Sequence, residues 1–148
     1  MKTVPEKLGL KSGLRAIFID APAALVADVS GAPGMQLSTQ LRGDFGIILA
    51  FVENQGQLDG SFDAWKRHLV VDGRLWIAWP KSGGADSDLN IKQVIRIGYE
   101  HGMVESNAIR IDDQWSALKF THPIAGKAYA NSYGTLNESA VRFYRKAR

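Results

Sequence analysis

The side chains best suited to binding or chemistry follow the ends of three apolar runs. Asp20 comes directly after the run 14–19, Glu53 after the run 45–52, and Lys81 shortly after the run 74–79. If these runs are parallel strands of one sheet, their carboxyl ends meet at one edge, where α/β sheets bind ligands. The candidate ligand-binding residues are therefore those of the three following loops: Asp20, Pro22, Glu53, Trp79, Lys81, Ser82 and Gly83.

Lys81 lies between an apolar run and a predicted helix start, next to Ser82 and Gly83. An ammonium group and backbone N–H groups in such a place favour a phosphate or a carboxylate. The spacing differs from the Walker A motif, which requires Gly-x-x-x-x-Gly-Lys-Ser/Thr. The alternative interpretation, which needs no ligand, is a surface lysine paired with Glu53 or Asp20.

Trp79 lies three residues after Trp76, so in one strand the two side chains face opposite sides of the sheet. At least one of them should then belong to the core. Trp79, at the strand end, is the candidate for an aromatic wall against a flat ligand. The carboxylates of Asp20 and Glu53 at neighbouring strand ends would permit a general base or a cation site, and ordinary solvated carboxylates are the alternative.

Several chemistries are excluded or disfavoured by what the sequence contains. It has no cysteine, which excludes disulfides, zinc–thiolate sites, thiol nucleophiles and iron–sulfur clusters. His68, His101 and His122 have no metal-like spacing, so no metal site is expected. No nucleophile-elbow motif of a serine hydrolase occurs. We therefore lean towards a chain that is not an enzyme.

The pattern of apolar runs predicts strands that alternate with helices. The expected strands are 14–19, 35–41, 45–52, 74–79, 104–111 and 115–121. The expected helices are a short one capped by Thr3 and Glu6 and stopped by Gly9, then 23–28, 57–69, and one that begins after Ser87 or Asp88 and stops before Gly102. Asp72-Gly73 predicts a turn, and 112–114 predicts the turn of a closing hairpin. The fold class is α/β: a Rossmann-like three-layer αβα arrangement, with a mostly parallel sheet and a C-terminal antiparallel hairpin.

The length of 148 residues fits one domain, which we expect to span 1–123, followed by a basic extension, 124–148. The first part carries 13 Lys and Arg against 14 Asp and Glu, whereas the extension carries 5 against 1. No recognised nucleic-acid-binding motif accompanies this basic C-terminal segment, so we do not expect nucleic-acid binding to be its role. A last helix from Thr135 or an edge strand over 140–144 are the alternatives for the extension, after a linker or surface loop over 126–134. With no signal-like or membrane-length apolar segment, we expect a cytoplasmic protein without membrane contact.

The order of elements resembles a shortened class I methyltransferase fold, with 14–19 as its first strand, 44–52 as its fourth and 72–76 as the start of its fifth. Three segments also resemble a bacterial family of small proteins of unknown function: residues 8–13, Leu75-Trp-Ile-Ala-Trp-Pro-Lys81 and Trp115-Ser-Ala-Leu-Lys-Phe120. The resemblance covers roughly residues 4–123. It implies the fold and no activity, because that family has none assigned.

One departure from the methyltransferase pattern bears on the cofactor. Where those enzymes have a glycine-rich loop, this chain reads Asp20-Ala-Pro-Ala-Ala24, and proline removes an N–H donor there. Gln40 and Arg42 occupy the neighbourhood of the acidic residue that would hold a ribose. The sequence thus disfavours ordinary binding of S-adenosylmethionine and leaves a rearranged mode open; no cofactor is expected.

The leading hypothesis is noncatalytic binding of a small anionic ligand or a protein partner on this scaffold. One alternative is a divergent transferase with a nucleotide-like cofactor at the Asp20, Glu53 and Trp79–Lys81 loops. A pocket lined by Trp79 would favour this alternative, and a filled sheet edge would oppose it. Another is a homo-oligomeric interaction module whose tail from Gly126 packs on a second copy of the chain, as in a homodimer.

Overall fold

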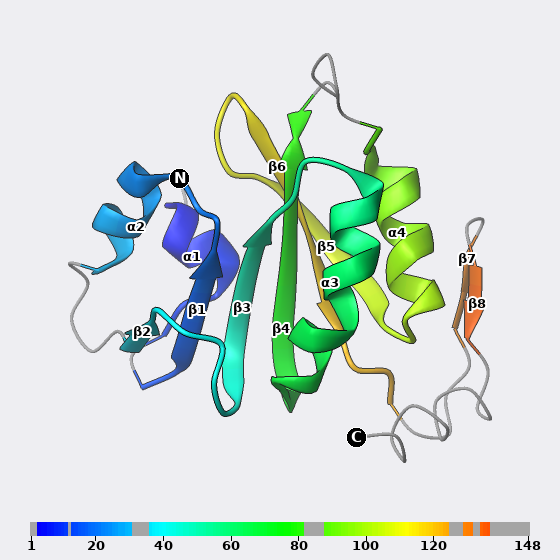
Figure 1. Ribbon diagram of the computed structural model, residues 1–148, viewed down its shortest axis with the longest axis horizontal. Helices are drawn as coiled ribbons and strands as arrows, with labels where there is room; N and C mark the ends of the chain where they lie inside the picture. Colours follow the sequence, from blue (N-terminus) through cyan, green and yellow to red (C-terminus); the bar gives the residue numbers. More distant parts are fainter. Residues whose placement is uncertain are drawn as a thin grey trace.

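The computed structural model describes residues 3–11, 13–30, 36–81, 88–124, 129–131 and 134–136. Its centre is a six-stranded sheet in the order β2-β1-β3-β4-β6-β5 (Figure 1). Strands β2, β1, β3 and β4 pair in parallel, and β6 is antiparallel to both of its neighbours. This confirms the predicted mostly parallel sheet with a closing hairpin. The strands are β1 (Arg15–Ile19), β2 (Gln36–Ser38), β3 (Phe45–Phe51), β4 (Leu69–Pro80), β5 (Val104–Arg110) and β6 (Trp115–Thr121).

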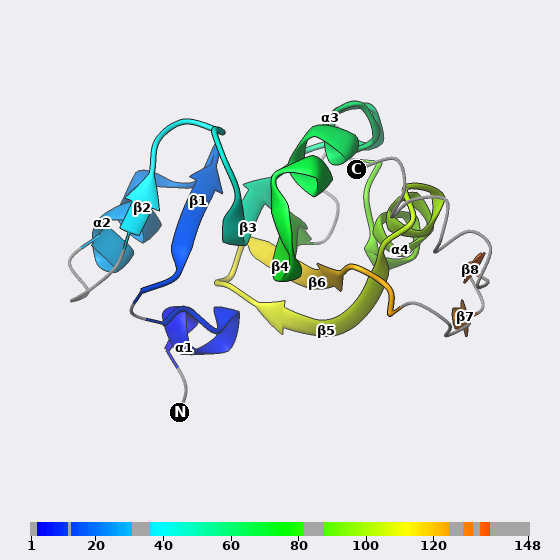
Figure 2. The ribbon, with the colours of Figure 1, turned by 90° about the horizontal axis from the view of Figure 1, so that it is seen from below.

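In the described parts of the chain, four helices cover the two faces of the sheet, as a three-layer α/β fold requires (Figure 2). Helices α3 (Gln55–Arg67) and α4 (Ile91–Glu100) contribute to the core on one face. Helices α1 (Val4–Leu8) and α2 (Ala23–Ser30) pack on the other. Residues of β3 alternate between the two cores: Ile47 and Leu49 face α1, whereas Ile48 and Ala50 face α3 and α4. Since β3 is buried on both faces, its nearly continuous apolar sequence is required.

Helix α1 is short and held on the sheet by hydrogen bonds at its carboxyl end. Trp76 Nε1 donates to Leu8 O at 3.0 Å, and Arg74 Nη1 donates to Gly9 O at 3.0 Å. Gly9 adopts φ 78°, a left-handed conformation that ends the helix. The predicted capping box of Thr3 and Glu6 is present at its start. Trp76 therefore both fills the core and satisfies a helix-end carbonyl group.

The predicted turn at Asp72-Gly73 is wrong, because both residues lie inside β4. Phe45 of β3 pairs with Leu69 of β4, and Ile47 of β3 pairs with Arg74 of β4. Two residues of β3 therefore span the same length as five residues of β4, which makes an irregularity in β4 between Leu69 and Arg74. Phe45 N also donates to His68 O at 2.7 Å, which brings the chain into the sheet directly from α3. The Asp-Gly signal thus marks a bulge rather than a reversal.

Both long helices begin at an asparagine that the prediction did not choose. Asn54 and Asn90 are extended, and their side chains accept hydrogen bonds from Gln57 N and Gln93 N. The predicted cap at Asp88 is therefore wrong, because its carboxylate accepts a hydrogen bond from Gln55 N instead. The other predicted cap, Ser87, lies outside the described residues.

Part of the C-terminal extension forms a second, two-stranded sheet of β7 (Tyr129–Asn131) and β8 (Gly134–Leu136), and β8 lies against α4 (Figure 1). The prediction of a helix capped by Thr135 is wrong, since Thr135 pairs with Ala130 in this hairpin. The predicted linker or loop 126–134 likewise contains β7. The alternative strand 140–144 lies outside the described residues. No helix in the described parts of the chain is long and apolar enough to cross a membrane.

Candidate functional site

The carboxyl ends of β1, β3 and β4 lie at one edge of the sheet, as predicted, because these strands are adjacent and parallel. Asp20, Glu53 and Lys81 follow these ends, and all three are exposed. In the described part of the chain Lys81 forms no ion pair with Asp20 or Glu53, so the simple surface-pair interpretation is not observed. Ser82 and Gly83 lie outside the described residues.

The loop after β1 is short, because α2 begins at Ala23. Asp20 adopts φ 56°, a left-handed conformation that aspartate tolerates better than most residues. Pro22 O accepts hydrogen bonds from Leu25 N at 3.1 Å and Val26 N at 3.2 Å, so the loop passes at once into α2. The cavity beside Pro22 measures only about 170 Å³ and is bounded by Leu25 and Ile111 among others. Ligand pockets for drug-sized molecules are typically about 300–1,000 Å³.

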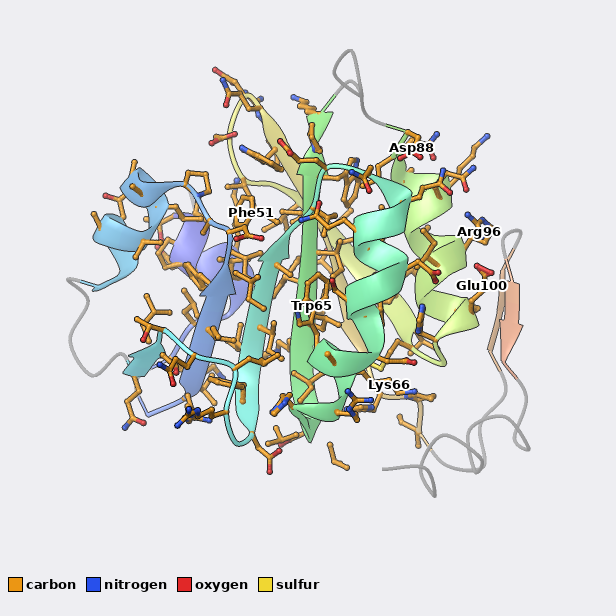
Figure 3. The ribbon with its side chains drawn as sticks, viewed as in Figure 1. Phe51, Trp65, Lys66, Asp88, Arg96 and Glu100 are labelled. Carbon is orange, nitrogen blue, oxygen red and sulfur yellow. The ribbon has the colours of Figure 1, made fainter. Side chains whose placement is uncertain are left out.

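Aromatic packing occupies the neighbouring part of this edge. The rings of Phe51, at the end of β3, and Trp115, at the start of β6, lie 4.9 Å apart between centroids and meet edge to face. Phe51 is labelled in Figure 3 beside the upper end of β3. Ile111, from the turn between β5 and β6, is 8% exposed and belongs to the same apolar cluster. Next to the exposed Asp20 and Glu53, this sheet edge thus also carries apolar packing against the closing hairpin.

A larger cavity, about 700 Å³, opens at the other half of the same edge. It lies between the end of β4, the segment that leads into α4, and the facing ends of β5 and β6. Its lining residues are Trp79, Asp88, Leu89, Asn90, Ile91, Ala108, Ile109, Arg110, Ser116 and Ala117. Of the predicted site residues that the structure describes, Trp79 lines this cavity and Pro22 lines the small one, whereas Asp20, Glu53 and Lys81 line neither.

The cavity has an apolar wall and a polar rim. Trp79 is buried in the core under α4, whereas Ile91 at the first position of α4 is 41% exposed. Asn90 Oδ1 accepts from Gln93 N at 3.0 Å, and within the described residues the N–H groups of Ile91 and Lys92 have no acceptor. A helix of ten residues carries partial positive charge at this end. The wall therefore suits an apolar group and the rim an anionic one.

The segment before α4 is fixed by Gln55, the first residue of α3. Gln55 N donates to Asp88 Oδ1 and Gln55 Nε2 donates to Asp88 O, each at 2.8 Å. Gln55 Oε1 accepts from Arg96 Nη2 at 3.0 Å, and Arg96 also pairs with Glu100 at 2.6 Å. Figure 3 shows Asp88 above α4 and both Arg96 and Glu100 along that helix. Because every polar group of the Gln55 side chain is used, the cavity rim is held in place before any ligand arrives.

The opposite rim is fixed by the turn of the closing hairpin. Arg110 pairs with Asp113, and its Nε donates to Asp112 O at 3.2 Å. The Asp112 side chain in turn accepts from Gln114 N and Trp115 N. Sequence reasoning missed Arg110, Asn90 and Asp88 as site residues. The hairpin was predicted, but its place beside β4 in the sheet was needed to bring Arg110 to Trp79.

The remaining polar clusters lie away from the cavity. His101 Nδ1 contacts Asp63 and His101 Nε2 contacts Asp59, each at 2.8 Å, and its ring stacks on Phe62. Lys119, whose Nζ lies 5.9 Å from the Trp76 ring centroid, has its pKa lowered by burial and by the nearby Arg74 charge. In the described part of the chain no three or more His, Asp or Glu side chains form a group that could hold a metal ion.

Comparison with known proteins identifies the fold. A methyltransferase from Pyrococcus furiosus matches with a TM-score of 0.59 and 13% identity, over 82% of this chain and 80% of that one. The ribosomal protein L11 methylase from Lactobacillus delbrueckii subsp. bulgaricus matches with a TM-score of 0.56 and 13% identity, over 80% of this chain and 74% of that one. Magnesium protoporphyrin IX methyltransferase from Synechocystis PCC 6803, solved with bound SAH, matches with a TM-score of 0.56 and 10% identity, over 81% of each chain.

These similarities confirm a methyltransferase-like α/β fold and, at such identities, nothing beyond the fold. No protein-family model matches the sequence, and no curated protein sequence matches it. The more specific resemblance to a small bacterial family therefore stays a prediction.

Proposed function

We propose that this chain is a noncatalytic binding domain on a methyltransferase-like scaffold, and that its ligand combines an apolar group with an anionic one. The observation that carries the proposal is the cavity of about 700 Å³ between Trp79 and the first turn of α4. The ligand's apolar group lies against Trp79 and Ile91. Its anionic group lies at the uncapped N–H groups of α4, near the Arg110 guanidinium. The Asp88 carboxylate also lines this cavity, and its Oδ1 accepts a hydrogen bond from Gln55 N at the start of α3.

The noncatalytic part of the proposal rests on the side chains around the cavity. A general base must lie within hydrogen-bond reach of the proton it removes. The three histidines all have partners elsewhere: His68 with Gly43 O, His101 with two aspartates, and His122 with Leu69 O. Ser116 and the Asp88 carboxylate both line the cavity, but among the described residues no hydrogen bond joins them, and Asp88 Oδ1 accepts from Gln55 N.

An adenosyl cofactor fits poorly at the loop where the fold would place it. Pro22 offers no N–H group there, and its carbonyl group is used by α2. The edge-to-face pair of Phe51 and Trp115 and the buried Ile111 occupy the adjoining surface. The small cavity of about 170 Å³ falls short of the volume that a nucleoside needs.

A divergent transferase is the second candidate function. Two observations favour it: a fold similar to that of an enzyme solved with bound SAH, and the Trp79 cavity at the carboxyl edge of the sheet. In this case the cofactor would use the Trp79 cavity rather than the loop after β1. The Trp79 cavity, at about 700 Å³, has the volume for that rearranged mode.

The test uses thermal unfolding with simple probes. Indole-3-acetate carries both required groups, whereas indole and acetate carry one each. At roughly a hundredfold above its dissociation constant a ligand adds about 2.7 kcal/mol to stability, which shifts the unfolding midpoint measurably. We expect a shift with indole-3-acetate, its loss in Ile91→Glu, and its retention in Val71→Glu, a matched change at an exposed apolar residue in the bulge near the start of β4.

S-adenosylmethionine and SAH are tested in the same assay. A shift with either compound that Ile91→Glu abolishes would replace the binding domain with the divergent transferase. A shift that Ile91→Glu leaves intact would place the cofactor outside the Trp79 cavity and contradict the argument from Pro22. If no probe shifts the midpoint, the proposed binding function is wrong.

A further inference from the structure

Strand β5 forms one edge of the sheet. It pairs with β6 on one side, and no described strand pairs with its other side. In an antiparallel pair, alternate residues direct both backbone groups to the partner strand. Ile111 N donates to Trp115 O at 2.9 Å, and Ile109 lies opposite Ala117 in the same register. Ala108 and Arg110 therefore turn their backbone N–H and C=O groups away from the sheet.

Two hollows flank this edge, one on each face of the sheet. The Trp79 cavity lies on the α4 face and is bounded by residues 108–110 of β5. A second hollow of about 320 Å³ is bounded by residues 107–110 and by Lys7 of α1, on the opposite face. Successive side chains of an extended chain point to opposite faces. A strand added along β5 would thus place one side chain in each hollow.

The two hollows differ in chemistry. The first has the apolar wall of Trp79 and Ile91, which suits an aromatic or aliphatic side chain. At the second, Lys7 Nζ lies 3.5 Å from Arg110 O, and no acidic residue is among its lining residues. A carboxylate there would be near the Lys7 ammonium group. The pair of hollows favours an apolar residue next to an acidic one.

We propose that the outer edge of β5, residues 107–110, binds an extended peptide segment that carries an apolar side chain next to an acidic one. This rests on the proposed function, because the apolar side chain is the group that enters the Trp79 cavity. Backbone hydrogen bonds supply affinity in this recognition mode, and the side-chain hollows supply specificity. A second copy of this chain, paired through the same residues 107–110, fits less well, since these residues include no acidic one.

The first arm of the test uses the wild-type chain and a fluorescent, end-blocked peptide Ser-Thr-Phe-Glu-Thr-Ser, with fluorescence anisotropy as the readout. Each backbone amide of the peptide is methylated in turn. An added strand predicts an alternating pattern, in which methylation of every second amide weakens binding by about tenfold and methylation of the others does not. Replacement of Phe by Ala, or of Glu by Lys, should also weaken binding by about tenfold or more.

The second arm changes the protein. Ala108→Pro removes an outward N–H group and leaves the hydrogen bonds between β5 and β6 intact, as edge strands tolerate. Lys7→Glu reverses the charge of the second hollow. Both should weaken peptide binding. Lys7→Glu should leave indole-3-acetate binding unchanged, because Lys7 does not line the Trp79 cavity, and binding of that small probe also shows that this variant is folded. A cooperative urea-unfolding transition shows that Ala108→Pro is folded. If Ala108→Pro does not fold, the methylation pattern on the wild-type chain decides alone.

The possible failures are distinguishable. If indole-3-acetate binds but methylation gives no alternation, or the peptide does not bind, the edge proposal is wrong and the small-ligand function stands. If neither indole-3-acetate nor the peptide binds, both the edge proposal and the proposed function are wrong. If sedimentation gives a dimer that Ala108→Pro dissociates, the occupant of the edge is a second copy of the chain, and the peptide proposal is overturned.

Discussion

The backbone N–H of Gln55 lies 2.8 Å from the Asp88 carboxylate, and the Gln55 side-chain amide donates to Asp88 O at the same distance. One residue at the start of α3 therefore fixes the chain segment that forms the rim of the Trp79 cavity. Two hydrogen bonds across 33 residues of sequence make this contact a tertiary one. The contact holds the start of α3 against the segment that leads into α4, and so it helps to set the shape of the cavity.

Loss of the Gln55 side chain should loosen this rim. Gln55→Leu keeps the backbone bond to Asp88 but removes the bonds to Asp88 O and Arg96. We expect a loss of about 1–2 kcal/mol in the free energy of unfolding, and weaker binding of indole-3-acetate. Urea unfolding and calorimetric titration measure the two effects. Gln36→Leu, an exposed change on β2, is the control, and equal binding by both variants would contradict the positioning role.

A second prediction concerns the contact of α3 with the end of α4. His101 bridges Asp59 and Asp63, which lie one helical turn apart on α3: Nε2 lies 2.8 Å from Asp59 Oδ1, and Nδ1 lies 2.8 Å from Asp63 Oδ1. The aspartate side chains are 64% and 63% exposed, so each pair should contribute only about 0.2–1 kcal/mol. A double-mutant cycle with Asp63→Asn and His101→Gln measures the coupling. Asp44→Asn in place of Asp63→Asn should give none, and equal coupling in both cycles would contradict the bridge.

The predictable parts of the fold are those decided by local patterns. The apolar run of β3 and the hairpin turn at 112–114 were found because burial on two faces and a short polar turn each leave a sequence signal. The Asp72-Gly73 bulge gave the same signal as a turn, and only the pairing of Leu69 with Phe45 separates the two outcomes. The helix cap at Asn90 was missed because Asp88 is an equally good cap by type. Its carboxylate is taken by Gln55, a contact with no local trace.

The cavity was predictable only in part, for a related reason. Trp79 was found because it ends a strand in a known place relative to the sheet edge. Arg110 and Asn90 reach the same cavity only because β6 inserts between β4 and β5 and because α4 starts above them. Neither fact follows from periodicity or from turn residues. Residues joined by sheet order rather than by sequence stay hidden from a pattern-based analysis.

Lys119 gives a prediction about pH. Burial and, secondarily, the Arg74 charge lower its pKa in the folded state below the ordinary value of 10.5. The unfolded chain then binds this proton more strongly than the folded chain does, so the stability of the wild type rises as pH increases from the lowered pKa towards 10.5. Below that window the charged lysine opposes folding. The free energy of unfolding of Lys119→Met, relative to that of the wild type, should therefore be highest at neutral pH and should fall as the pH rises.

The measurement is urea unfolding of both proteins at several pH values from neutral to alkaline. Lys92→Met, at an exposed lysine of α4, gives the reference for loss of one positive charge elsewhere. A constant difference between Lys119→Met and the wild type across the range would contradict the lowered pKa. If the stability of Lys119→Met relative to the wild type instead increases with pH, the pKa of Lys119 is raised rather than lowered.

The last prediction compares two helical glycines with opposite surroundings. A Cβ atom at Gly98 in α4 would collide with the Phe120 ring of β6, whereas a Cβ at Gly60 in α3 meets nothing within 4 Å. Gly98→Ala should therefore overpack the core and lower stability by about 1–3 kcal/mol. Gly60→Ala should raise it by about 0.5–1 kcal/mol, because alanine favours a helix and narrows the unfolded ensemble.

The two changes add the same methyl group to the same kind of element, so helix propensity alone would raise stability in both. Opposite signs in urea unfolding would thus isolate the packing of Phe120 against α4. Phe120→Leu should relieve Gly98→Ala, since a smaller side chain leaves room for the new methyl group, and the double mutant should lose less than the sum of the single losses. Strict additivity would mean that Gly98 is required for a reason other than the close approach of this ring.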